Sequence, residues 1–295
     1  MWSKLLYNQL WNIGFCRLTT SDFIASQTLP SIKWLNHSYK DRWFADPFIY
    51  KITEGEIVVF VEELPIENPK GIICELVIDR KTMRLKERYV MLELDTHLSY
   101  PAIIEENGRT YVYPENGQSG KLNLYEYDAV NHKLINPVCI VDEPLADSTI
   151  FRMGDYYYLC ATKYPDTQEK VYLYKSNSLK GVYLPCSESP FNINKGCSRP
   201  AGDWILSNNE LYRPAQDCIK RYGHSISMMS VDIKDNTVSE NIMFSVIPVS
   251  WRYNLGIHTI NFKDGFCVVD SFGYLHPVIA RIIFFLINIK HKVGL

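Results

Sequence analysis

The sequence predicts an all-β protein that folds as a five-bladed β-propeller with a short C-terminal helix. One pattern recurs five times: a polar residue opens an apolar strand, and an aromatic-rich strand follows about ten residues later. No stretch before residue 277 shows a sustained helical period, which argues against an α/β fold. The openers lie 47 to 59 residues apart, a spacing that fits four short strands per blade. They are Asp46, Tyr100, Asp147, Arg199 and His258.

The recurrence divides the chain into blades, which we assign to one domain covering residues 1–295. The predicted blades lie near residues 44–80, 98–129, 147–176, 198–233 and 256–275. Turn residues such as Asn107-Gly108 and Asp264-Gly265, which tolerate positive φ, mark the hairpins between first and second strands. Third strands alternate apolar and polar residues, as in residues 121–128.

The two ends of the chain contribute further elements. Residues 11–18 form a strand that we expect to complete the last blade and close the ring; a strand outside the ring is the alternative. Residues 278–292 are too few to span a bilayer and are expected to form a helix after Pro277. This apolar run, interrupted by Arg281 and followed by two lysines, fits either a helix packed on the propeller or a peripheral membrane contact.

Composition and charge indicate which classes of ligand and which cellular compartment to expect. The net charge is −2 and the aromatic residues are not interleaved with basic ones, so we do not expect nucleic-acid binding. Eight cysteines without CxxC spacing, and a first segment without an apolar signal region, favour a cytoplasmic protein that could contact the membrane peripherally. We expect no cofactor and no metal, because no compact metal-ligand spacing occurs, although His258 with Asp46 or Asp147 could hold an ion.

The chemistry is expected where the five first strands converge on the propeller axis. Two acids, an arginine, a histidine and a tyrosine at one mouth are a costly arrangement for stability alone, because desolvated charges need partners. We therefore interpret the five openers as a functional site. The alternative is that Asp46 and Asp147 only cap turns, as aspartate often does.

Two glutamates extend this candidate site. Glu62 and Glu115 each lie seven residues after the hairpin glycine of their blade, so their side chains are expected to point in equivalent directions. Glu63 has the opposite strand parity, so we expect one of these two neighbours to face the cleft and the other to face solvent. The residues expected to bind the ligand are Glu62, His97, Tyr100, Arg199, Arg213 and His258.

Several motifs, taken in order, resemble a known family. They are Ala45-Asp46-Pro47-Phe48 with a following Phe-Val-Glu-Glu strand, His97-Leu98-Ser99-Tyr100-Pro101, Asp147-Ser148-Thr149-Ile150-Phe151 and Ser198-Arg199-Pro200-Ala201-Gly202-Asp203. Over residues 11–275 the chain resembles the N-terminal β-propeller domain of plant glucosamine inositolphosphorylceramide transferases and their bacterial relatives. The layout is more distantly similar to the family 43 glycoside hydrolases, which are five-bladed propellers.

The resemblance to family 43 implies roles for the acidic residues. It makes Asp46 the general base and Asp147 the group that orients and tunes the acid. Arg199 stands at the position of the acid and cannot donate a proton at neutral pH, so the acid must be Glu115 or Glu62. We favour Glu115, because its aromatic surroundings are expected to keep it protonated.

The leading interpretation is a carbohydrate-active protein, a glycoside hydrolase-like enzyme with its substrate in the funnel. Arg199, Arg213 and His258 would also suit an anionic group such as a phosphate or uronate. The alternative is a non-catalytic glycan-binding module that assists a partner glycosyltransferase in polysaccharide or glycolipid synthesis. A third interpretation, a scaffold for protein partners, predicts that the polar residues pair with one another and leave no cavity.

Overall fold

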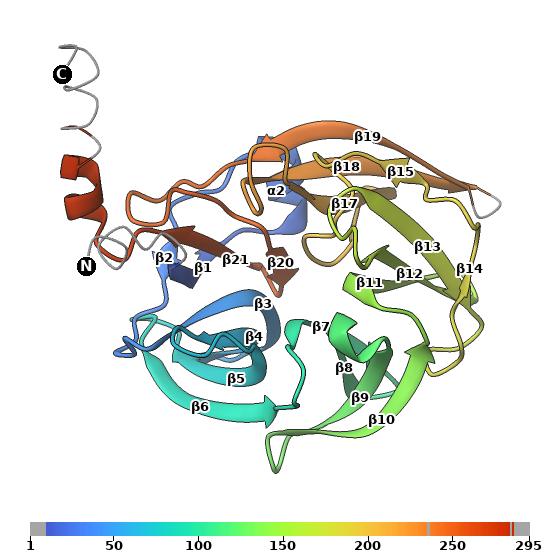
Figure 1. Cartoon of the computed structure of the whole chain (residues 1–295), viewed down its shortest axis with the longest axis horizontal. Helices are drawn as coiled ribbons and strands as arrows, with labels where there is room; N and C mark the ends of the chain where they lie inside the picture. The colour runs from blue at the N-terminus through green and yellow to red at the C-terminus, as the bar shows by residue number, and fades with distance from the viewer. Residues whose placement is uncertain (1–9, 235–236, 284, 286–295) are drawn as a thin grey trace.

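The computed structural model describes residues 10–234, 237–283 and 285. Within them, five antiparallel sheets surround a common axis (Figure 1), which confirms the predicted five-bladed β-propeller. Each blade is a four-stranded sheet, except that a fifth short strand pairs with the third strand of blade three.

The strands fill the first four blades in chain order. Blade one contains β3 (Arg42–Ile52), β4 (Glu56–Pro65), β5 (Ile72–Asp79) and β6 (Leu85–Leu92). Blade two contains β7 (Ser99–Glu106), β8 (Arg109–Glu115), the 3₁₀ helix η1 (Gly117–Ser119), β9 (Leu122–Asp128) and β10 (Lys133–Val141). Blade three contains β11 (Leu145–Met153), β12 (Tyr156–Lys163), β13 (Lys170–Ser176), β14 (Leu184–Pro185) and β15 (Asn192–Ile193). Blade four contains β16 (Ile205–Ser207), β17 (Glu210–Asp217), β18 (Ser225–Lys234) and β19 (Thr237–Val246).

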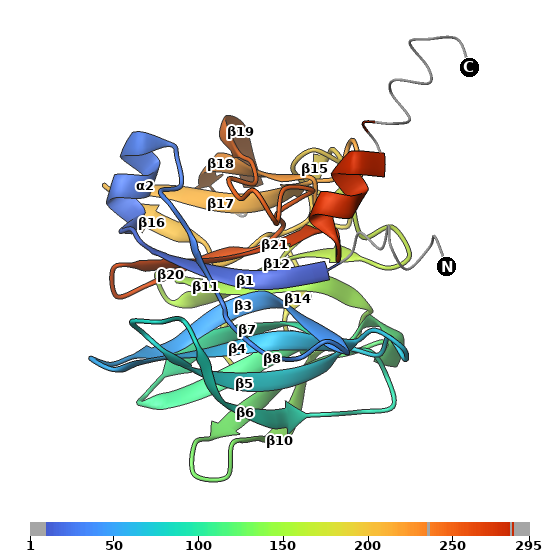
Figure 2. The same cartoon turned by 90° about the vertical axis from the view of Figure 1, so that its left-hand side faces the viewer.

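Blade five combines strands from the two ends of the described chain. It contains β20 (Ile260–Lys263), β21 (Phe266–Gly273), β1 (Leu10–Arg17) and β2 (Lys33–Trp34). β1 pairs antiparallel with β21 along its whole length, from Leu10 opposite Gly273 to Arg17 opposite Phe266. This pairing links the first strand of the chain to the last blade, so β21 is not a free edge (Figures 1 and 2).

The first strands of blades one to three share an irregularity near the axis. Asp46, Tyr100 and Asp147 have φ angles of 49°, 46° and 46°, and the pairing register of each strand shifts at that residue. A bulge of this kind leaves a residue outside the regular ladder. The backbone N–H groups of these three residues are therefore available to partners outside their own sheet.

Blades four and five begin their first strands later than the sequence indicated. β16 and β20 start at Ile205 and Ile260 rather than at Arg199 and His258. Pro200 has no N–H to pair and Gly202 has a φ of 141°, so the segment before Ile205 does not form a regular ladder.

The sequence pattern did not predict one short helix. α2 (Thr20–Ser26) is too short to show a helical period, and it is stabilised by Thr19, whose hydroxyl accepts the Asp22 N–H at 3.1 Å.

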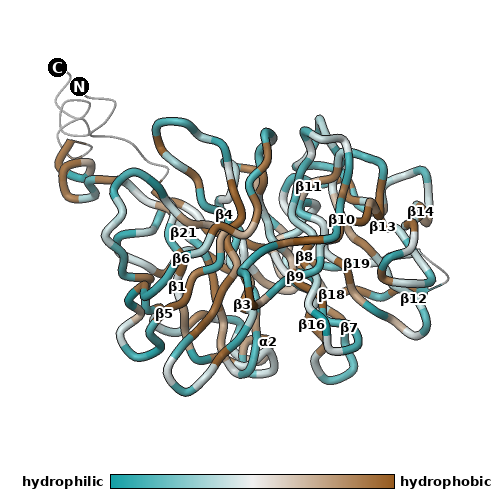
Figure 3. The backbone as a smooth tube through the Cα atoms, turned by 90° about the horizontal axis from the view of Figure 1, so that it is seen from below, coloured by the Kyte–Doolittle hydropathy of each residue, from teal (hydrophilic) through white to brown (hydrophobic). Residues whose placement is uncertain are grey.

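The apolar core lies between the blades, where inner strands are covered on both faces. Figure 3 shows apolar stretches along the strands and hydrophilic residues in the connecting loops. Glu63 reflects this burial: it is 0% exposed and bound by the guanidinium groups of Arg42 and Arg88. The prediction that one of the two neighbouring glutamates faces solvent is therefore wrong, because both faces of β4 are covered and two arginines neutralise the buried charge.

Residues 277–283 form the start of the predicted C-terminal helix, which projects from the propeller (Figure 2). Residues 286–292 of that predicted helix lie outside the described residues. Among the described residues, no helix has the length and apolar character needed to cross a membrane.

Candidate functional site

A cavity of about 460 Å³ lies where the ends of β3, β4 and β8 meet loops from the later blades. Its polar lining is Asp46, Glu62, His97, Ser99, Glu115, Arg199, Arg221 and His258. Six of the predicted site residues therefore meet in one cavity, which argues against a scaffold whose polar groups leave no space. A larger hollow of about 740 Å³ beside Trp204 is lined mainly by apolar side chains, and its charged residues Arg152, Glu210 and Asp232 are exposed rather than brought together by burial.

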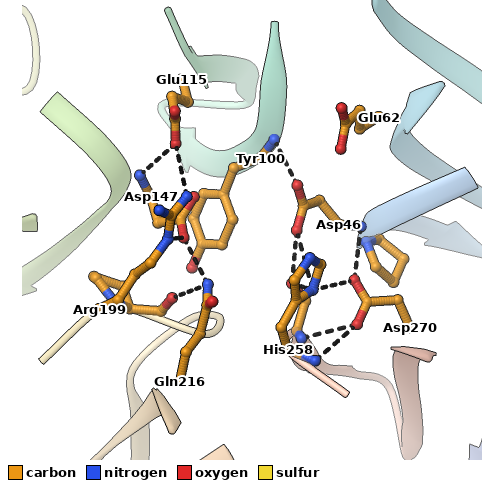
Figure 4. Close-up of polar contacts among 12 residues, drawn as sticks. Asp46, Glu62, Tyr100, Glu115, Asp147, Arg199, Gln216, His258 and Asp270 are labelled. Atoms are coloured by element: carbon orange, nitrogen blue, oxygen red, sulfur yellow. Dashed lines mark hydrogen bonds and ion pairs between the residues drawn. The ribbon is translucent and has the colours of Figure 1, made fainter. Parts of the chain in front are cut away.

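Carboxylates from one blade hold the bulged backbone of the next (Figure 4). Asp270 of blade five accepts the Asp46 N–H at 2.9 Å, and Asp46 accepts the Tyr100 N–H at 3.2 Å. In the same way, Glu115 of blade two accepts the Asp147 N–H at 3.0 Å. The positive φ at each bulge thus turns a backbone N–H toward a carboxylate of the neighbouring blade. The acidic residues of the candidate site therefore also hold neighbouring blades together.

Asp46 and His258 form one charged group with Asp270. Nδ1 of His258 lies 2.7 Å from Asp270 Oδ2 and 3.7 Å from Asp46 Oδ1, while Thr259 Oγ1 donates to Asp46 Oδ1 at 2.7 Å. Burial raises the pKa of Asp46 to about 7, and the His258 charge opposes this rise. Burial alone would lower the pKa of His258, but Asp270 and Asp46 together raise it to about 9.

This group should make the stability of the protein depend on pH. The folded-state pKa of His258 is raised from 6.5 to about 9, so its contribution is complete below pH 6.5 and is lost as pH rises through 9. The raised pKa of Asp46 acts in the same direction. We expect the free energy of unfolding to fall by roughly 3 kcal/mol between these limits. Urea denaturation at both limits measures the change.

Two histidine variants separate this effect from the rest of the chain. His258→Gln should flatten the decline, whereas the exposed His276→Gln should keep the slope of the parent protein. Equal slopes for the parent and His258→Gln would contradict the assignment.

Arg199 neutralises the opposite side of the cavity. Its Nε donates to Asp147 Oδ2, its Nη1 donates to Thr167 Oγ1 at 2.8 Å, and its Nη2 lies 3.5 Å from Glu115 Oε2. Asp147 is 2% exposed and lies behind Arg199, where Gln216 also donates to it at 2.6 Å. Burial raises the pKa of Asp147, and the Arg199 charge opposes that rise.

The contacts of Glu115 do not match the expected general acid. Its oxygens accept the Asp147 N–H and the Tyr164 hydroxyl, and Arg199 lies beside them. All three are donors that point at the Glu115 oxygens, and none of them is an acceptor for a Glu115 proton. Glu115 is thus arranged as an acceptor, although it lines the cavity where the sequence placed it.

Glu62 and His97 form a second polar pair in the wall. Gly71 N–H donates to His97 Nδ1 at 2.9 Å, which leaves Nε2 to donate to Glu62 Oε1 at 3.3 Å. A side chain at Gly71 would meet the Leu98 carbonyl and the Glu62 carboxylate, so glycine is required for this approach. Burial would lower the pKa of His97, but the Glu62 carboxylate raises it. Among the described residues, no lysine or arginine lies at salt-bridge distance from Glu62.

Aromatic side chains form the rest of the wall, and the sequence did not identify them. They are Trp11, Trp43, Tyr164, Tyr222 and Phe272. Trp11 stacks on the His258 ring with a centroid distance of 4.0 Å, and the Tyr222 ring lies 5.2 Å from the Arg199 guanidinium. Trp11 reaches the cavity because β1 completes blade five. Its place in the wall could therefore be predicted only from the way the ring closes.

Two predicted ligand-binding residues lie elsewhere. Tyr100 is 0% exposed: its ring packs edge-on against Phe48, and its hydroxyl lies 3.1 Å from Thr149 Oγ1. Arg213 is also 0% exposed and is bound by the Glu240 carboxylate and by backbone carbonyls. Both predictions are wrong for binding through the side chain, because burial engages these groups inside the fold: Tyr100 contacts blade three, and Arg213 is held within blade four.

Asp46, His258 and Asp270 offer ligand atoms within 4.8 Å of one another, a spacing that a metal ion could use. Asp270 already accepts four donors, however: the backbone N–H groups of Asp46, His258 and Thr259, and His258 Nδ1. An ion here would have to replace these bonds, so the geometry fits a hydrogen-bond network better than a metal centre.

Comparison with known proteins identifies the family that carries this cavity. Residues 20–253 match the family described as glucosamine inositolphosphorylceramide transferase 1, N-terminal. The chain belongs to this family. It is 28% identical over 218 residues to glucosamine inositolphosphorylceramide transferase 1 of Arabidopsis thaliana, and 24% identical over 202 residues to the protein of that name from Oryza sativa subsp. japonica. The alignments cover 71% and 66% of this chain but only 28% and 27% of those relatives.

Solved structures share the propeller at low sequence identity. Zg3597, a family 117 glycoside hydrolase of Zobellia galactanivorans, has a TM-score of 0.57 and 10% identity, covering 90% of this chain and 92% of its own. A thermostable family-43 glycoside hydrolase has a TM-score of 0.56 and 12% identity, with coverages of 76% and 85%. The likeness of this chain to these hydrolases is one of fold.

Proposed function

We propose that this domain binds a carbohydrate without hydrolysing it and so assists a glycosyltransferase in glycolipid or polysaccharide synthesis. The wall of the cavity supports a sugar ligand, because it combines stacked aromatic rings with buried carboxylates, and these suit the faces and hydroxyl groups of a pyranose. The family supports the association with glycosyl transfer.

The single observation that carries the proposal is the position of Arg199. The resemblance to family 43 implies that Arg199 stands at the position of the acid, and here its guanidinium is held by Asp147, Thr167 and Glu115. An arginine cannot protonate a leaving oxygen at neutral pH. Glu115, the remaining acid candidate, is held as an acceptor. The cavity therefore offers groups suited to a sugar, while neither Arg199 nor Glu115 is arranged to protonate a leaving group.

The Glu62 carboxylate in the cavity wall favours a sugar that carries an amino group. The guanidinium of Arg199 is engaged by Asp147, Thr167 and Glu115, so it is not free to bind an anion. Glu62 is contacted by His97 and by no lysine or arginine among the described residues, and its carboxylate can bind an ammonium group. This preference agrees with the glucosamine in the name of the plant relatives.

Calorimetric titration with glucosamine and with glucose tests this proposal. We expect glucosamine to bind more tightly, and Glu62→Gln to weaken glucosamine binding by about tenfold or more while changing glucose binding little. Glu67→Gln is the matched control, because Glu67 is exposed and lies outside the cavity. The parent should not hydrolyse nitrophenyl glycosides. Turnover that disappears in Glu115→Gln would instead establish the enzyme.

A further inference from the structure

The C-terminal helix presents an apolar stripe that the described residues leave uncovered. Val278, Ile282 and Phe285 are 56%, 55% and 65% exposed, and their spacing places them on one helical face. Ala280 is buried and faces the propeller instead. The helix that carries this stripe projects from the ring of blades (Figure 2).

A neighbouring loop extends this stripe into a larger surface. Trp251 is 58% exposed, and Ile247 and Val249 in the same loop are also exposed. Arg281 on the helix donates to the Trp251 carbonyl at 2.9 Å, and its guanidinium lies 4.9 Å from the Trp251 ring centroid. These two contacts hold the helix and the loop together as one apolar surface with a cation between them.

The charge around this surface has one sign. Residues 218–224, 247–257 and 274–283 contain Lys220, Arg221, Arg252 and Arg281 but no aspartate or glutamate. This composition is unusual for a chain with a net charge of −2. The first two segments are connected, because the Arg221 guanidinium donates to the Leu255 carbonyl. The lysine and arginine residues of these three segments are therefore the charges nearest the apolar surface in the sequence, while Asp217, just before the first segment, lies 3.6 Å from His224.

We propose that this surface binds the interface of an anionic membrane. Aromatic and aliphatic side chains on a projecting helix and loop can enter the boundary between head groups and acyl chains, with tryptophan at the level of the head groups. The bordering arginines and lysine then lie at the depth of the lipid phosphates and are attracted by anionic lipids. A second copy of this chain would place the same cations against each other, so charge complementarity favours the membrane.

The position of the surface links it to the cavity. Leu255 follows Trp251 in the loop, and its N–H donates to the carbonyl of Phe272, which lines the cavity together with Arg221. A domain seated on lipid through this surface would hold the cavity beside membrane-attached head groups. That link to a glycolipid rests on the proposed sugar binding, whereas the membrane contact itself does not.

Vesicle co-sedimentation of the full chain tests the membrane contact. The probes are vesicles of phosphatidylcholine alone and vesicles of phosphatidylcholine with phosphatidylserine. We expect binding to the anionic vesicles that weakens at high salt, and a loss of about tenfold for each of Trp251→Ser and Phe285→Ser. Leu206→Ser is the matched control: Leu206 is 70% exposed but lies on β16, away from this surface, and its variant should bind like the parent.

Three outcomes would overturn the proposal. They are absence of binding to anionic vesicles, equal loss in Leu206→Ser, and a parent dimer in solution that Trp251→Ser dissociates. The side chains changed are exposed, so thermal melting should show that every variant folds. Soluble glucosamine is titrated into the same variants. If a variant loses vesicle binding but keeps the sugar affinity of the parent, the membrane surface is separate from the cavity. If the parent protein does not bind glucosamine, only the proposed function is refuted.

Discussion

Arg199→Met is expected to destabilise the protein by about 3–5 kcal/mol, because it leaves buried carboxylates without their cation. Asp147 and Glu115 are 2% and 4% exposed, and Arg199 contacts both. Methionine fills a similar volume, so the decrease in the free energy of unfolding measures the missing charge rather than a void left in the core. Without Arg199, the pKa of Asp147 should rise further, and the variant should recover part of its stability at low pH. Urea denaturation at neutral and acidic pH measures both effects.

Two further variants test the cause of that loss. Adding Asp147→Asn to Arg199→Met removes one unpaired charge and should restore part of the free energy of unfolding. Lys86→Met breaks an exposed ion pair with Glu56 and should cost less than about 1 kcal/mol. If Arg199→Met costs no more than Lys86→Met, or if Asp147→Asn restores nothing, Arg199 does not neutralise this side of the cavity.

The sequence predicts most of the ring because each blade repeats the same local signals. The hairpins at Asn107-Gly108 and Asp264-Gly265 have positive φ at both residues, and the openers lie near the axis as expected. Glu62 and Glu115 could be found because they occupy equivalent positions in β4 and β8, opposite Ala45 and Ser99. Gln216 lies at the corresponding end of β17, seven residues after its hairpin, so the same rule would have found it.

The orientation of buried polar groups could not be predicted from one sequence. Strand parity separates two faces, but in an inner strand both faces are covered, so Glu63 and Arg213 are as buried as the residues of the core. Their partners decide their roles. Glu240, which binds Arg213, lies on the outer strand β19, and no periodic signal connects the two. Asp270 was missed because it follows its hairpin glycine by five residues rather than seven.

Asp46→Asn is expected to weaken sugar binding by about ten- to hundredfold and to destabilise the fold by about 1–3 kcal/mol. The carboxylate lines the cavity and also accepts the Tyr100 N–H and the Thr259 hydroxyl. An asparagine side chain has one acceptor oxygen, so its NH₂ must face one of these donors. The contacts with Tyr100 and Thr259 therefore give a physical reason to expect a lower melting temperature.

Thr259→Val separates the two roles of Asp46. Thr259 is 0% exposed and does not line the cavity, so valine removes the inner contact with Asp46 and leaves the cavity surface unchanged. We expect Thr259→Val to lower the melting temperature as Asp46→Asn does, but to bind glucosamine within about twofold of the parent. Calorimetry and thermal melting of both variants decide the question. If Asp46→Asn binds the sugar as tightly as Thr259→Val, Asp46 only connects blades five, one and two, and sugar recognition belongs to Glu62 and the aromatic wall.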